Sequence, residues 1–192
     1  MLTEKQFRER TKSELRQIGN QVQGLATDRD VYWKLEREII QPNSQLRETR
    51  SPFLDMLRGC YTDAMAAQVL RLLNGEEGAI SLPRVLAQLA DYPQLRQDKI
   101  TDGEFAADRA ALQQAAASLK QAIMPHAGHH ERTLSALAAM HRELDAALGL
   151  IIDTLRTYYW IVAESYLDLE AKYTEDPLAI FQSAWAVPVL AR

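Results

Sequence analysis

Residues 133–172 read TLSALAAMHRELDAALGLIIDTLRTYYWIVAESYLDLEAK. Apolar residues recur in this stretch at alternating spacings of three and four, the pattern of an amphipathic helix with one buried face. This stripe consists of Leu134, Leu137, His141, Leu144, Leu148, Ile151, Leu155, Tyr158, Val162 and Leu169. We expect one long helix over 133–172. A stripe of this length needs other helices to cover it, so the stretch predicts a helical bundle.

Helical spacing of apolar residues recurs in most of the remaining chain. The expected helices cover 4–40, 52–73, 82–90, 102–124 and 133–172, with a short terminal helix from Asp176-Pro177 to about Trp185. The first of these is either one helix or a kinked pair, with the TDRD stretch at 27–30 as its weak point. Residues 42–50 are expected to form a polar connection.

Local signals mark where several of these helices begin. Thr3 with Gln6, and Thr101 with Glu104, match the capping box, in which two side chains bond to free amides at the start of a helix. Ser51-Pro52 matches the favoured pairing of an N-cap with a first-turn proline. Asn74-Gly75 is a typical helix end.

No stretch has the alternating β-branched pattern of a strand. We therefore expect an all-α fold: an antiparallel bundle of four main helices with short additional helices. Neither a repeat nor a flexible linker divides the chain, so residues 1–192 are expected to form a single domain. Within it, 173–192 should form a short C-terminal helix that packs on the bundle.

The composition narrows the function classes. The chain is 47% hydrophobic and 25% charged, with a formal net charge of −4. That charge argues against a protein that coats DNA, although a local RNA site remains open. No segment reaches the roughly 20 apolar residues that a membrane span needs. We expect a cytoplasmic protein with no membrane or DNA partner.

Three of the four histidines lie in KQAIMPHAGHHER, residues 120–132. His126, His129 and His130 could bind zinc, nickel or copper as neutral imidazoles. Pro125 and Gly128 make a continuous helix through them unfavourable, and no CxxC pair accompanies them. A solvated turn between helices explains the same residues. No metal or other cofactor is expected, and the histidine metal site is kept as an alternative.

The fourth histidine, His141, lies on the apolar stripe of the long helix. The sequence predicts a buried or half-buried core histidine, with Asp145, four residues later, as its hydrogen-bond partner. In an antiparallel pair of helices it should face the region of Gln114 and Ala115.

The segment Lys120-Gln121-Ala122-Ile123-Met124-Pro125-His126 resembles the motif of the HEPN superfamily, in which an arginine and a polar residue precede a histidine near a helix end. Residues 64–90 and the long helix over 133–172 are similar to its abortive-infection (AbiU-like) branch. Lysine stands where the family has arginine, and it cannot make a planar bidentate contact with phosphate.

This resemblance implies a metal-independent endoribonuclease of a toxin–antitoxin or phage-defence system, or an RNA-binding protein that has lost that activity. His126 would be the acid/base, Lys120 the cation beside the phosphate and Gln121 an orienting group. It also implies a homodimer in which two motifs share one cleft. An antitoxin or a nucleotidyltransferase would be its partner.

A non-enzymatic bundle that binds itself or a partner is the alternative. Aromatic residues cover more than one face of the long helix, at Tyr158, Tyr159, Trp160 and Tyr166. A helix that is apolar all round must be covered by something. The cover could also be the terminal helix of the same chain, with Phe181 and Trp185.

Overall fold

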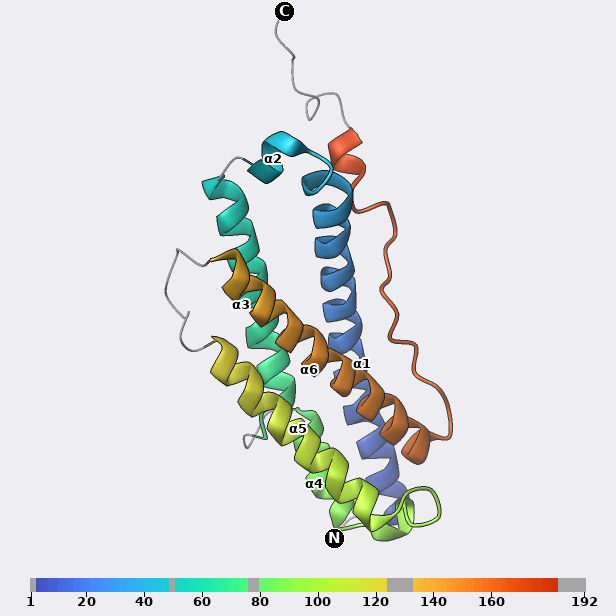
Figure 1. Cartoon of the computed structure of the whole chain (residues 1–192). Coiled ribbons are helices and arrows are strands. Elements are labelled where there is room, and N and C mark those ends of the chain that lie inside the picture. The colour runs from blue at the N-terminus through green and yellow to red at the C-terminus, as the bar shows by residue number, and fades with distance from the viewer. Residues whose placement is uncertain (1–2, 49–50, 76–79, 124–132, 183–192) are drawn as a thin grey trace, which may run out of the picture.

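The computed structural model describes residues 3–48, 51–75, 80–123 and 133–182, and in this part of the chain it contains helices and no strand (Figure 1). The α-helices are α1 (Glu4–Lys34), α2 (Ser44–Glu48), α3 (Pro52–Leu73), α4 (Leu82–Ala90), α5 (Asp102–Ile123) and α6 (Leu134–Ala163). A π-helical turn, Leu35–Ile40, continues α1, and two 3₁₀ turns span Pro93–Leu95 and Ala179–Gln182. The predicted all-α class is confirmed.

The four long helices α1, α3, α5 and α6 form the bundle. Helix α6 contacts α1, α3 and α5, and α3 also contacts α1 and α5. Figure 1 shows α3 running opposite to α1, and α6 running opposite to α5 across them. The antiparallel bundle of four main helices is therefore present. The short helix α4 packs on α1, α3 and α5.

Aliphatic side chains from these helices form one continuous core. The completely buried ones include Leu15, Ile18, Val22, Val69, Leu82, Leu86, Leu89, Leu112, Leu119, Ile151 and Leu155. They belong to α1, α3, α4, α5 and α6 and follow the spacings read from the sequence. Burial of such side chains stabilises the fold by roughly 1.5–3 kcal/mol each.

The predicted helix starts agree with the structure. Gln6 donates its backbone N–H to Thr3 Oγ1 at 3.3 Å, and Thr3 returns the bond from its own N–H to Gln6 Oε1 at 3.0 Å. Thr101 and Glu104 make the same reciprocal pair before α5. Helix α3 begins at Pro52, as expected, with Ser51 in the N-cap position, although the Ser51 side chain makes no capping hydrogen bond. Two capping boxes and one first-turn proline thus mark where these helices begin.

The predicted weak point of the first helix is wrong. Residues 27–30 are regular α-helix, and the distortion comes later, in the π-helical turn Leu35–Ile40. Its wider turn is closed by the bond from Gln41 N–H to the Glu36 carbonyl, 2.8 Å long. Such turns occur frequently at functional sites. The expected polar connection also contains α2.

The long helix ends earlier than its apolar pattern does. Glu164 adopts the left-handed conformation, with φ of 52°, and α6 stops at Ala163 instead of continuing to 172. Lys99 Nζ donates to the Ile161 carbonyl at 3.0 Å and to Glu164 Oε1 at 2.7 Å. A cation that binds the last carbonyls stabilises a helix end at this point.

Residues 164–178, which we call the strap, then run along α1 (Figure 1). Gln23 donates to the Asp168 carbonyl at 3.2 Å, and Lys172 N–H donates to Thr27 Oγ1 at 3.1 Å. Leu169 of the strap is buried although it is not helical. The predicted terminal helix is only the 3₁₀ turn Ala179–Gln182 within the described residues, and 183–192 lie outside them.

The aromatic residues that suggested a partner face are partly covered by the chain itself. Tyr158 and Tyr159 are buried, whereas Trp160 is 41% and Tyr166 is 91% exposed. Tyr166 belongs to the strap and not to the helix. In the described part of the chain, no helix combines the length and the apolar character needed to cross a membrane.

Candidate functional site

The residues predicted to carry RNA chemistry lie at one end of α5. Lys120 and Gln121 are exposed in the last turn of this helix, and neither side chain has a hydrogen bond or ion pair with another described residue. His126 lies outside the described residues, as do His129 and His130. The Lys120–His126 pair and the alternative metal site therefore stay predictions. In the described residues, no group of three metal-binding side chains comes together.

His141 is the buried histidine that the sequence predicts, but its surroundings differ from the expected ones. It is 7% exposed, and its Nε2 lies 2.9 Å from Thr62 Oγ1 of α3. The predicted partner Asp145 instead forms an ion pair with Arg29 of α1. At this level the stripe of α6 faces the space between α1 and α3, so the predicted contact with Gln114 and Ala115 of α5 is wrong.

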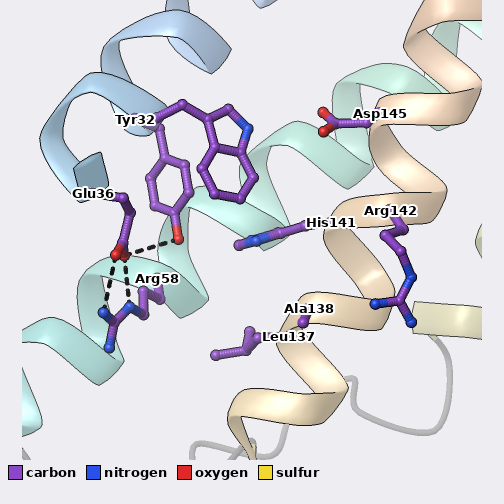
Figure 2. A pocket seen from close by; sticks show the side chains of 9 residues that line it. Tyr32, Glu36, Arg58, Leu137, Ala138, His141, Arg142 and Asp145 are labelled. Atoms are coloured by element: carbon purple, nitrogen blue, oxygen red, sulfur yellow. Dashed lines mark hydrogen bonds and ion pairs between the residues drawn. The ribbon is translucent and has the colours of Figure 1, made fainter. Parts of the chain in front are cut away.

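A pocket of about 400 Å³ opens beside His141 (Figure 2). Its lining comes from the end of α1, the π-helical turn, α3 and α6, and consists of Tyr32, Trp33, Glu36, Arg58, Leu137, Ala138, His141, Arg142 and Asp145. Three segments that are distant in the sequence therefore meet here. The volume lies within the range of roughly 300–1,000 Å³ that is usual for small-molecule sites.

An ion pair forms one wall of this His141 pocket. Arg58 donates from Nε to Glu36 Oε1 at 2.7 Å and from Nη2 to Oε2 at 3.1 Å, and Tyr32 donates its hydroxyl to Oε1 at 3.2 Å. Figure 2 shows the three side chains converging. The side chains of Arg58 and Glu36 are only 17% and 8% exposed. Burial and the nearby Glu36 carboxylate raise the pKa of Tyr32.

Aromatic rings surround the imidazole of His141. The ring centroids of Tyr32, Trp33 and Tyr61 lie 5.2, 5.5 and 5.7 Å from that of His141, each in an edge-to-face arrangement. Tyr32 and Tyr61 are themselves stacked at 3.8 Å. Burial lowers the pKa of His141, although the Asp145 and Glu36 carboxylates act in the opposite direction. The imidazole is therefore neutral at pH 7.

Most of this site was not predicted. No functional role was expected for the residues that line or support it, namely Tyr32, Trp33, Glu36, Arg58 and Thr62. One local signal was present in the sequence: the aromatic pair Tyr32-Trp33 is followed, three residues after Trp33, by Glu36. In the structure this glutamate is only 6% exposed. The partners of Glu36 and His141 come from α3, and no short-range pattern in the sequence specifies them.

The arrangement can hold a ligand and exchange protons with it. A neutral imidazole accepts a proton or a hydrogen bond, and the aromatic and aliphatic lining supplies an apolar surface. The Glu36–Arg58 pair, which also lines the pocket, offers further hydrogen-bonding atoms.

Comparison with known proteins gives no relative: the chain matches no family model, no curated protein and no solved structure. The HEPN resemblance stays a prediction based on the sequence alone.

Proposed function

We propose that this protein binds a small organic molecule in the His141 pocket. The observation that carries the proposal is the buried polar wall formed by Glu36, Arg58 and Tyr32 beside an apolar space of about 400 Å³. Buried charges are costly to keep, and an apolar replacement is often neutral or stabilising. Their presence around a void rather than in a filled core is typical of a binding site.

Ligand-detected and protein-detected NMR with a fragment library tests this proposal. Binders are expected to shift the indole N–H signal of Trp33, which is assigned by its loss in Trp33→Phe. Trp160, which lies outside the pocket lining, serves as the internal control. A library with no binder, or binders that move only signals remote from the pocket, would contradict the proposal.

A second candidate function is RNA cleavage or RNA binding by Lys120, Gln121 and His126. The observation in its favour is that Lys120 and Gln121 are both exposed on the last turn of α5 without described partners, so a phosphate can reach them. His126 would transfer the proton, and a homodimer would bring two motifs together. An antitoxin or nucleotidyltransferase would then be the partner that controls it.

Incubation of the purified protein with RNA in the presence of EDTA tests this second function. Cleavage is expected to disappear in His126→Ala and to weaken in Lys120→Ala, while His141→Gln should cleave as the unmodified protein does. Equal cleavage by all variants would mean that another nuclease is present. No cleavage and no RNA binding would rule this function out.

A further inference from the structure

The charged groups of the His141 pocket cancel in pairs. Glu36 is paired with Arg58, and Asp145 is paired with Arg29. The remaining cation of the lining, Arg142, is exposed, and its side chain points away from His141 in Figure 2. Beside the His141 ring, a charged ligand would lose part of its hydration next to charges that are already paired, which is unfavourable. The pocket therefore favours an uncharged ligand.

The hydrogen bonds of Thr62 determine which nitrogen of His141 carries the proton. The Thr62 hydroxyl lies 2.7 Å from the Arg58 carbonyl, to which it donates, and 2.9 Å from His141 Nε2. A hydroxyl has one hydrogen, so Nε2–H must be the donor in the second bond. In the neutral ring Nδ1 then carries a lone pair, and no described residue donates to it. His141 Nδ1 is thus a hydrogen-bond acceptor without a partner.

Arg58 supplies the complementary donor. Its guanidinium has five N–H groups, and the two bonds to Glu36 use one on Nε and one on Nη2. The remaining N–H groups can bind a carbonyl oxygen. Tyr32, Trp33 and Leu137 provide flat and apolar lining surface in the same pocket.

From this set of groups we infer that the ligand is an uncharged, planar cyclic amide: its N–H donates to His141 Nδ1, its carbonyl oxygen accepts from Arg58, and its ring packs against the aromatic lining. The inference rests on the proposed function, because it specifies the chemistry of a ligand for the same pocket. Beyond the proposed function, it states that the pocket prefers ligands that have an amide N–H and no net charge.

Isothermal titration calorimetry with four bicyclic probes tests this inference. These are 2-quinolone, N-methyl-2-quinolone, 2-naphthoate and 2-naphthylmethylammonium. The first is the cyclic amide, the second lacks its N–H, and the others carry a negative or a positive charge. We expect 2-quinolone to bind most tightly and N-methylation to weaken binding roughly ten-fold, the upper end for one lost hydrogen bond.

His141→Gln is the matched protein variant, because the glutamine amide N–H can still donate to Thr62, while its carbonyl oxygen lies at a different position along the side chain from the Nδ1 lone pair. This variant should bind 2-quinolone roughly ten-fold more weakly than the unmodified protein does. Arg156→Gln is the control and should bind as the unmodified protein does, since Arg156 is exposed on the same helix and does not line the pocket. Circular dichroism and thermal unfolding confirm that each variant is folded.

The outcomes separate the two levels of the proposal. One contrary result is that a charged probe binds more tightly than 2-quinolone and is displaced by fragments that shift the Trp33 signal. This result would overturn the cyclic-amide inference, but the pocket would still be a ligand site. Binding of 2-quinolone that neither N-methylation nor His141→Gln weakens would also overturn it. If no probe binds and the fragment library contains no binder, both the inference and the proposed function fail.

Discussion

Two regions of the bundle each contain a tyrosine hydroxyl that donates to a carboxylate, but the surroundings of the two pairs differ. In the first, Tyr158 is completely buried, packs edge-to-face on Phe105 and donates to Asp108 at 2.9 Å. In the second, Tyr32 donates to Glu36, whose other partner is a buried arginine. Asp108 is half-buried, so water can solvate it, whereas Glu36 depends on the protein.

The difference lies in what surrounds the tyrosine. Around Tyr158 aliphatic and aromatic side chains belong to the main core, while Tyr32 borders an open pocket and contacts the ring of His141, which also lines it. A buried hydroxyl–carboxylate bond is thus compatible with a filled core and does not by itself indicate a site. The pocket and the paired charges make the Tyr32 region distinct.

The largest expected effect is that of Glu36→Ala. It leaves the Arg58 guanidinium buried without its bidentate partner, which costs about 3–5 kcal/mol of unfolding free energy. Urea denaturation measures this loss. The exposed pair Lys172–Asp168 is the control, because Lys172→Ala should cost at most about 1 kcal/mol. Equal effects would show that the Glu36 pair is solvated.

Two leucine truncations compare the filled region with the open one. Leu112, one turn beyond Asp108 on α5, is completely buried, and Leu112→Ala should cost about 3 kcal/mol because it creates a cavity. Leu137→Ala should cost less, since it enlarges an existing pocket that water can enter. The same denaturation experiment measures both. A larger loss for Leu137→Ala would mean that the pocket region is packed as tightly as the core.

The pH dependence of stability should reflect His141. Burial lowers its pKa in the folded state, while Asp145 and Glu36 raise it and Arg58 lowers it further. As pH falls, the His141 side chain therefore takes up its proton in the unfolded chain before it does so in the folded protein. The contribution of His141 to the free energy of unfolding is complete above a pH of about 6.5 and is lost as pH falls towards the folded pKa. Denaturation midpoints between pH 8 and 5 measure it. His141→Gln should flatten this dependence, and an unchanged profile would assign it to other groups.

The smallest expected effects concern α1 beneath the strap. A Cβ at Gly19 would lie 2.6 Å from Leu167 Cδ2, the mobile end of a side chain, whereas a Cβ at Gly24 meets nothing within 4 Å. Alanine in place of helical glycine stabilises by about 0.5–1 kcal/mol. Gly24→Ala should show this gain, and Gly19→Ala should show less because Leu167 must move. Equal gains would mean that the strap does not rest on Gly19.

Local chemistry explains which parts of the fold the sequence predicts. The capping residues at Thr3 and Thr101 and the Ser51-Pro52 start act within a few residues of the chain, and the structure confirms them. In the strap, the spacing of apolar residues predicts which side chain is buried but not whether the backbone is helical. Leu169 continues the spacing of α6 and is buried, yet it lies in the strap after the helix has ended.

The candidate site was less accessible to sequence reasoning because its bonds are long-range. The sequence predicted Asp145, four residues away on the same helix, as the hydrogen-bond partner of His141. The bond is instead made with Thr62 of α3, which is distant in the sequence. The inward position of Glu36 depends on the π-helical turn, which the spacing of apolar residues does not reveal.

The most direct test is the ¹⁵N NMR spectrum of the histidine rings, recorded with and without 2-quinolone. The account predicts that His141 is neutral at pH 7 with its proton on Nε2, and that the Nδ1 signal moves when the ligand binds, while His141→Gln identifies the signal by its loss. A proton on Nδ1, or an Nδ1 signal that 2-quinolone leaves unchanged at saturation, would contradict it.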